Sequence, residues 1–108
     1  METKDYIDML KSKSKAPIYV AMQHALCYYL FANDVPCSII EKVMRKSRSN
    51  VYYGINQARD MLEVGDKFMQ QGYDEVQHHK IRILPCTVDG NIFSRHVGYK
   101  LLIDNIIY

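Results

Sequence analysis

Three segments between residues 16 and 62 repeat apolar side chains at the spacing of an α-helix, and short polar turns separate them. Apolar residues three and four positions apart share one helix face, so the pattern predicts amphipathic helices that bury their stripes against one another. We expect the first helix at 16–31, the second from Pro36 to about Arg45, and the third at 49–62. The pattern indicates a mainly α-helical domain.

The joints between these segments carry residues that stop or cap helices. Asn33-Asp34 is a turn signal, and either Ser47 or Ser49 can cap the third helix. Gly65-Asp66 reads as a break with a new cap, after which apolar residues at helical spacing predict a fourth helix. Gly72 weakens that helix, because glycine has low helix propensity.

Both ends of the chain differ from this helical centre. We expect 1–15 to form a short helix followed by a basic arm, and 16–79 to form the helical domain. Residues 80–108 alternate apolar and polar side chains, which predicts a small β-hairpin or three-stranded extension that packs on the core or on a second chain. Asp89-Gly90 is a hairpin turn signal, and Pro85 confines its strand to a sheet edge. The fold class is therefore a trihelical core with a fourth helix and a C-terminal β element.

Composition narrows the classes of function. A chain of 108 residues with a net charge of +2 is one domain whose average charge alone does not imply nucleic-acid binding. Three cysteines with no CxxC pair argue against a disulfide framework and favour a reducing cytoplasm. Residues 1–15 lack the apolar core of a signal peptide, and no apolar run approaches the roughly 20 residues that span a membrane.

Candidate catalytic and metal-binding residues gather only near the C-terminal third. His78, His79, Cys86 and His96 match no zinc spacing, and we expect His78 and His79 to lie exposed at a helix end. Cys86 with His96 lacks the orienting third group that nucleophilic catalysis needs. We therefore expect no enzyme activity, metal, cofactor or small-molecule substrate.

Basic residues concentrate at the turn between the second and third helices. Four cations fall between residues 42 and 48 with no acidic residue among them. The major groove of DNA is about 12 Å wide and admits one helix, whose N-terminal side chains reach base edges while nearby cations contact phosphates. The residues expected at the DNA are Lys42, Arg45, Lys46, Ser47, Arg48, Ser49, Asn50 and Tyr53. Arg48 suits guanine and Asn50 suits adenine, although a phosphate contact is equally open for both.

The segment 40–51, Ile-Glu-Lys-Val-Met-Arg-Lys-Ser-Arg-Ser-Asn-Val, continued by Tyr-Tyr-Gly-Ile-Asn, carries a family resemblance. It resembles the DNA-binding C-terminal domain of the replication initiator DnaA and its phage and mobile-element relatives, whose fold is related to that of the Trp repressor. The resemblance covers about 16–65 and implies binding of double-stranded DNA in replication or transcription control.

The chain departs from that family at three places. Ser47 and Arg48 stand where the family has an acidic residue and a histidine, so the family's target sequence does not carry over. Val20 stands near the place of the family's minor-groove arginine, for which Lys13 or Lys15 of the arm can substitute. No GxxxxGK loop is present, which excludes the initiator's ATPase activity.

The alternative function is a protein-interaction module that kept the helical fold and lost DNA binding, because fold does not determine function. The apolar segment 101–108 supports it, since an uncovered strand of this kind seeks a partner. For the same reason we expect residues 80–108 to mediate self-association, as a homodimer that would place two reading helices on two half-sites.

Overall fold

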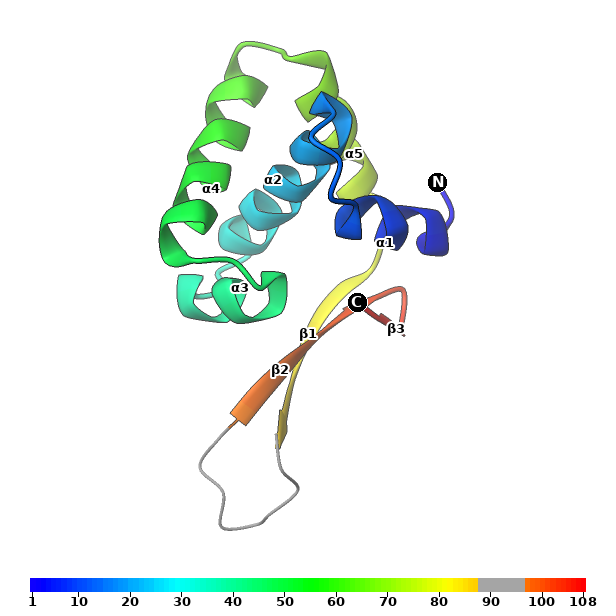
Figure 1. Cartoon of the computed structure of the whole chain (residues 1–108), viewed down its shortest axis with the longest axis vertical. Coiled ribbons are helices and arrows are strands. Elements are labelled where there is room, and N and C mark those ends of the chain that lie inside the picture. Colours follow the sequence, from blue (N-terminus) through cyan, green and yellow to red (C-terminus); the bar gives the residue numbers. More distant parts are fainter. Residues whose placement is uncertain (88–96) are drawn as a thin grey trace.

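The computed structural model describes residues 1–87 and 97–108 (Figure 1). Within these residues the chain forms five helices followed by a three-stranded antiparallel sheet, which confirms the expected fold class. The elements are α1 (Thr3–Lys11), α2 (Pro17–Ala32), α3 (Cys37–Met44), α4 (Arg48–Glu63), α5 (Lys67–Gln77), β1 (Ile81–Thr87), β2 (Val97–Ile103) and β3 (Ile106–Ile107).

Helix α2 is the centre of the molecule, with α4 and α5 packed on its two sides (Figure 1). Its sequence holds no Lys, Arg, Asp or Glu, and a helix that is apolar all round is stable only when its neighbours cover it. Met22, Leu26 and Leu30 are almost fully buried along it. Each such side chain contributes about 1.5–3 kcal/mol of burial free energy, so α2 organises the core.

Side-chain caps set where α4 and α5 begin. Ser47, rather than Ser49, caps α4, because its hydroxyl accepts a hydrogen bond from the backbone N–H of Asn50 at 3.3 Å. Asp66 caps α5 by accepting from the N–H of Met69 at 2.9 Å. Caps of this type stabilise a helix by about 1 kcal/mol, so the sequence signals at both joints were interpreted correctly.

Two helical glycines allow α2 to approach its neighbours closely. A β-carbon at Gly72 of α5 would lie 3.3 Å from the backbone of Ala21, which is tighter than an ordinary contact. Gly54 of α4 faces His24 of α2 in the same way, with a β-carbon only 2.9 Å from the ring. Gly72 therefore serves helix packing, a role its low helix propensity does not reveal.

The sheet order is β1-β2-β3, so Pro85 lies on an edge strand, as expected. The strands β1 and β2 run away from the helices (Figure 1) and pair in register from Ile81 opposite Ile103 onward. Asp104 and Asn105, both with positive φ, make the two-residue turn to β3. The expected turn at Asp89-Gly90 lies outside the described residues.

The C-terminal sheet completes the helical core on one side. Leu101 and Ile103 are buried in the same apolar cluster as Tyr6 and Met22, whereas Ile106 and Ile107 remain about half exposed. Alternation along β2 places Leu101 and Ile103 on the same face, since every second side chain of a strand points the same way. The apolar residues Ile92 and Phe93 of the C-terminal extension lie outside the described residues.

His79 corrects one expectation from the sequence. His78 is exposed at the end of α5, as expected, but His79 is buried and the prediction of its exposure is wrong. The ring of Tyr6 stacks on its imidazole at 4.5 Å, and Asp104 and Glu75 contact its two nitrogens at 2.6 and 3.1 Å. These partners come from distant segments, so the helix-end position of His79 does not predict them.

Across residues 1–87 and 97–108, no helix combines the length and apolar character needed to cross a membrane.

Candidate nucleic-acid interface

The chain reverses between α3 and α4 within three residues. Arg45 ends α3 in the left-handed conformation, with φ 54° and ψ 47°. The backbone N–H groups of Arg45 and Lys46 both donate to the carbonyl of Glu41, which satisfies the free carbonyl at the helix end. Ser47 then caps α4. The turn is therefore held by backbone hydrogen bonds and one side-chain cap.

The two faces of α4 have different chemistry. Val51, Ile55 and Ala58 are buried against the core. The side chains expected to read bases, Arg48, Ser49, Asn50 and Tyr53, are all exposed in the first turns of the helix. This orientation follows from the apolar stripe, because burying one face of a helix turns the other to solvent.

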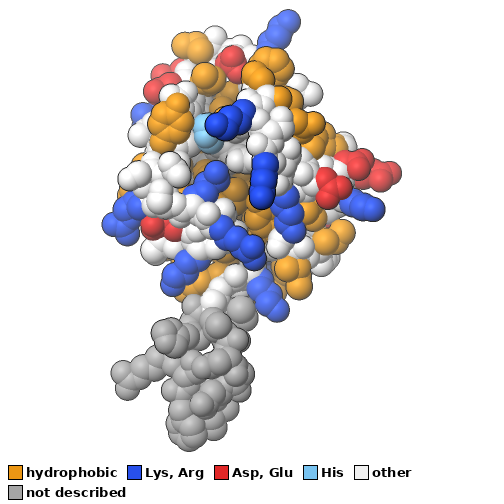
Figure 2. All heavy atoms as spheres, in the orientation of Figure 1, with side chains coloured by type: hydrophobic (Ala, Val, Ile, Leu, Met, Phe, Trp, Pro, Cys, Tyr) orange, Lys and Arg blue, Asp and Glu red, His pale blue; other side chains and the backbone are white. Residues whose placement is uncertain are grey.

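The cations expected to contact phosphates lie just before α4, in α3 and in the turn that follows it. Lys42 and Arg45 are exposed and Lys46 is half-buried. Lys and Arg side chains gather across the middle of one face of the molecule (Figure 2). The eight predicted residues share one segment, so the turn alone brings them together.

Arg48 has a partner on α3. Its Nε lies 3.5 Å from Oε2 of Glu41, while its side chain remains 66% exposed. An exposed ion pair contributes at most about 1 kcal/mol, because water and salt screen it. The pair orients Arg48 in the free protein, and releasing it toward another anion costs little.

His24 joins the site from α2. The rings of His24 and Tyr53 meet edge to face, with 5.7 Å between their centroids. Burial, and to a lesser degree the nearby Lys46, lower the pKa of His24 below its usual value. His24 is therefore neutral at pH 7 and supports Tyr53 by packing. The role of His24 was not expected from the sequence, because no local pattern distinguishes this position within the mainly apolar helix α2.

No metal centre emerges in the described residues. Among residues 1–87 and 97–108, no group of three His, Cys, Asp or Glu side chains is arranged to hold a metal ion. His79 is engaged by carboxylates from Glu75 and Asp104, as described above. The side chain of Cys86 and all of His96 lie outside the described residues.

Comparisons of this chain with protein-family models, with curated proteins and with solved structures found no match.

Proposed function

We propose that this protein binds double-stranded DNA sequence-selectively, with α4 as the reading helix in the major groove, and that it regulates transcription or replication. One observation carries the proposal. The first turns of α4 expose polar side chains, Lys42, Arg45 and Lys46 flank them, and the opposite face of α4 is buried in the core. This is the arrangement by which a helix-turn-helix reads bases while flanking cations contact phosphates.

The residues divide by the reach of their side chains. Lys42, Arg45 and Lys46 contact phosphates on either side of the groove. Arg48, Ser49, Asn50 and Tyr53 lie on the exposed face of α4 and reach base edges. Ser47 positions the others, because its hydroxyl is already used to cap the helix.

The resemblance to the DNA-binding domain of DnaA supports the same assignment. The resemblance covers about residues 16–65, which include α3, the turn and α4. Because Ser47 and Arg48 replace the family's acidic residue and histidine, the preferred sequence is this protein's own.

We also propose that the protein acts as a two-fold dimer through its C-terminal sheet. Ile106, Ile107 and Leu84 leave apolar surface exposed there, and β1 and β3 are the edge strands. Two reading helices would then contact half-sites about one turn of DNA apart. Sedimentation at tens of micromolar should show a dimer that Ile107→Asn converts to a folded monomer, and a monomeric wild type would refute pairing.

The decisive experiment is selection of bound oligonucleotides from a random duplex pool. The full chain should enrich one motif, and Arg48→Ala should lose preference at one position of it. Arg59→Ala is the matched control, because Arg59 is an exposed arginine of the same helix, beyond the N-terminal turns that carry the proposed contacts. Failure to retain any duplex would refute DNA binding.

A protein partner is the second candidate. Met61, Val64 and Phe68 expose apolar side chains where α4 ends and α5 begins, on a different part of α4 from the polar reading face. If the chain retains no duplex, these residues are the surface at which a partner would be sought by substitution.

A further inference from the structure

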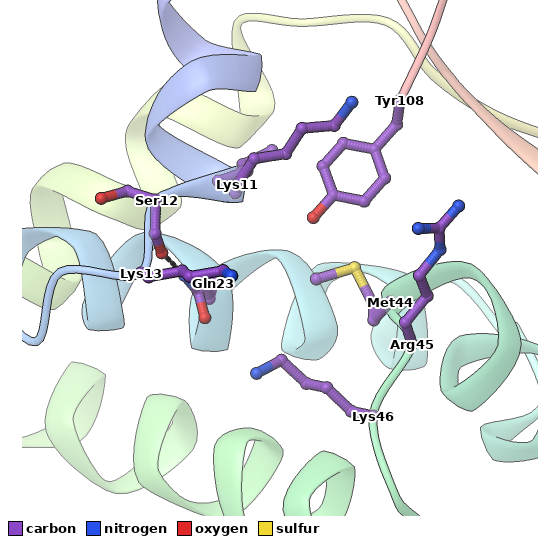
Figure 3. A pocket seen from close by; sticks show the side chains of 9 residues that line it. Lys11, Ser12, Lys13, Gln23, Met44, Arg45, Lys46 and Tyr108 are labelled. Atoms are coloured by element: carbon purple, nitrogen blue, oxygen red, sulfur yellow. Dashed lines mark hydrogen bonds between the residues drawn. The ribbon is translucent and has the colours of Figure 1, made fainter.

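A cavity of about 490 Å³ opens beside the turn between α3 and α4 (Figure 3). Its walls come from segments that are far apart in the sequence. Lys11 ends α1, and Ser12 and Lys13 follow it. Gln23 belongs to α2, Met44 ends α3, Arg45 and Lys46 lie in the turn, and Tyr108 comes after β3. The fold alone brings these groups to one place.

The cavity concentrates positive charge. Lys11, Lys13, Arg45 and Lys46 all line it, and no Asp or Glu side chain does. Within the parts of the chain that the structure describes, none of the four forms an ion pair. Four like charges with no acidic side chain among them repel one another, so an anion that entered the cavity would be attracted by all of them.

The walls are held in place before any ligand arrives. The side-chain amide of Gln23 donates to the carbonyl of Ser12 at 3.2 Å, which ties the arm to α2. The ammonium of Lys11 lies 5.3 Å from the centre of the Tyr108 ring, a cation–π distance (Figure 3). Burial raises the pKa of the Tyr108 hydroxyl, so that group stays protonated as a hydrogen-bond donor at neutral pH. A preorganised site loses less entropy on binding.

We propose that this cavity binds a phosphate group, with Lys11, Lys13, Arg45 and Lys46 as its counter-charges and the Tyr108 hydroxyl as a donor. Phosphate suits these groups, because it is negatively charged and its oxygens accept hydrogen bonds from ammonium, guanidinium and hydroxyl donors. The volume lies within the range of about 300–1,000 Å³ typical of small-molecule sites, and the Met44 side chain and the Tyr108 ring add apolar wall for an organic moiety.

Two sources can supply this phosphate. One is a free phosphorylated small molecule. The other is the backbone of a duplex lying across the turn, and this source rests on the proposed function, since Arg45 and Lys46 are shared with the DNA interface. The first source is independent of DNA binding, so the two can be tested separately.

The first test measures binding of inorganic phosphate and of pyrophosphate to the full chain by calorimetry in chloride buffer. The double variant Lys11→Gln/Lys13→Gln should weaken pyrophosphate binding about tenfold or more, and Tyr108→Phe should weaken it a few-fold. Lys15→Gln is the control, because it removes one positive charge from the same arm as Lys13, while Lys15 lines a different hollow. It should leave affinity within about twofold. Thermal unfolding of each variant checks that the fold is intact.

The second test measures duplex binding against salt concentration. If the cavity holds a backbone phosphate, the double variant should lower the log–log salt slope by up to about one, the share of one phosphate contact. Lys67→Gln, on α5 and away from the cavity, should leave the slope unchanged. A protein that binds pyrophosphate through this cavity but binds no duplex would refute the proposed function and keep this proposal.

The combined outcomes decide the proposal. If the double variant loses only pyrophosphate affinity, the ligand is a free phosphorylated molecule. If only the salt slope of duplex binding changes, the ligand is the DNA backbone. If both change, the two ligands share the site. The proposal is wrong if neither quantity changes in the double variant, or if Lys15→Gln weakens pyrophosphate binding as much as the double variant does, because the effect would then be general charge.

Discussion

Nδ1 of His79, at the end of α5, lies 2.6 Å from Oδ2 of Asp104, in the turn between β2 and β3. The same carboxylate accepts from the Thr3 hydroxyl at 2.5 Å and from the backbone N–H of Lys80 at 2.7 Å. One side chain thus ties α1, α5 and β1 to the C-terminal turn. The contact explains how a short sheet with few buried residues stays attached to the helices.

Asp104 gives the fold a dependence on acid. The hydrogen bond from His79, then those from Thr3 and Lys80, lower the pKa of Asp104 from 3.8 to about 2. The folded protein therefore binds this proton less readily than the unfolded chain, so Asp104 stabilises the fold above about pH 4 and loses that effect as the pH falls toward 2. Urea unfolding across this range should show the decline.

The variant Asp104→Asn isolates this group, because asparagine also tolerates the left-handed turn conformation. It should cost about 1 kcal/mol at pH 7, a value reduced for a side chain that is one third exposed, and should flatten the decline below pH 4. Asp8→Asn, an exposed carboxylate on α1, should leave both unchanged. An unaltered pH profile in Asp104→Asn would contradict the assignment.

The effect of Gly54→Ala on the free energy of unfolding should change sign when the facing residue, His24, is replaced by alanine. In the wild type a β-carbon would lie 2.9 Å from the His24 ring, and overpacking of that kind typically costs 1–3 kcal/mol. In a His24→Ala background the clash is gone, and the helix propensity of alanine should then stabilise the protein by about 1 kcal/mol. Thermal or urea unfolding of the four proteins measures the coupling. Equal effects in both backgrounds would show that the close approach is unimportant.

Two substitutions of Arg45 distinguish the effect of its backbone strain from the effect of its charge. Arg45→Gly and Arg45→Ala both remove the cation, but only glycine relieves the left-handed conformation at φ 54°. The glycine variant should be more stable than the alanine variant by about 1 kcal/mol, while both lose the same duplex affinity. Unfolding and fluorescence anisotropy with a labelled duplex distinguish the two quantities. Unequal affinities of the two variants would mean that duplex binding depends on the backbone conformation of the turn and not only on the charge of Arg45.

Duplex binding should weaken steeply with salt. Three to five phosphate contacts give a log–log slope of about −3 to −4.5, since each contact releases condensed counterions. Lys42→Gln and Lys46→Gln should each lower the slope by about one and leave the preferred sequence unchanged, with Lys67→Gln as the control. Affinity that does not vary with salt would rule out phosphate anchoring.

Glu41 should restrain DNA binding through Arg48. Glu41→Gln removes a carboxylate beside the proposed groove and frees Arg48 at a cost of at most about 1 kcal/mol, so affinity for all duplexes should rise. Arg48→Ala should instead lose about 1–3 kcal/mol at one base position. Binding assays on the selected site and on single-base variants check both. A uniform loss in Arg48→Ala would reassign Arg48 to a phosphate.

The local structure of this protein could be predicted from its sequence. Apolar residues at helical spacing predicted α2, α3, α4 and α5, and alternation after Lys80 predicted strands, because these patterns arise within a few residues. The polar face of α4 followed from the same stripe. The side-chain cap at Asp66 was equally local, although the choice between Ser47 and Ser49 needed the structure.

The tertiary structure decided what depends on segments far apart in the chain. It buried His79 between Tyr6 and Asp104, and it brought Lys11 and Tyr108 beside Lys46 to build the cavity. Neither arrangement has a local signal, because each depends on how whole helices pack against α2 and on where the sheet returns. Periodicity tells which face of an element is buried, whereas the packing of all the elements determines which side chains meet.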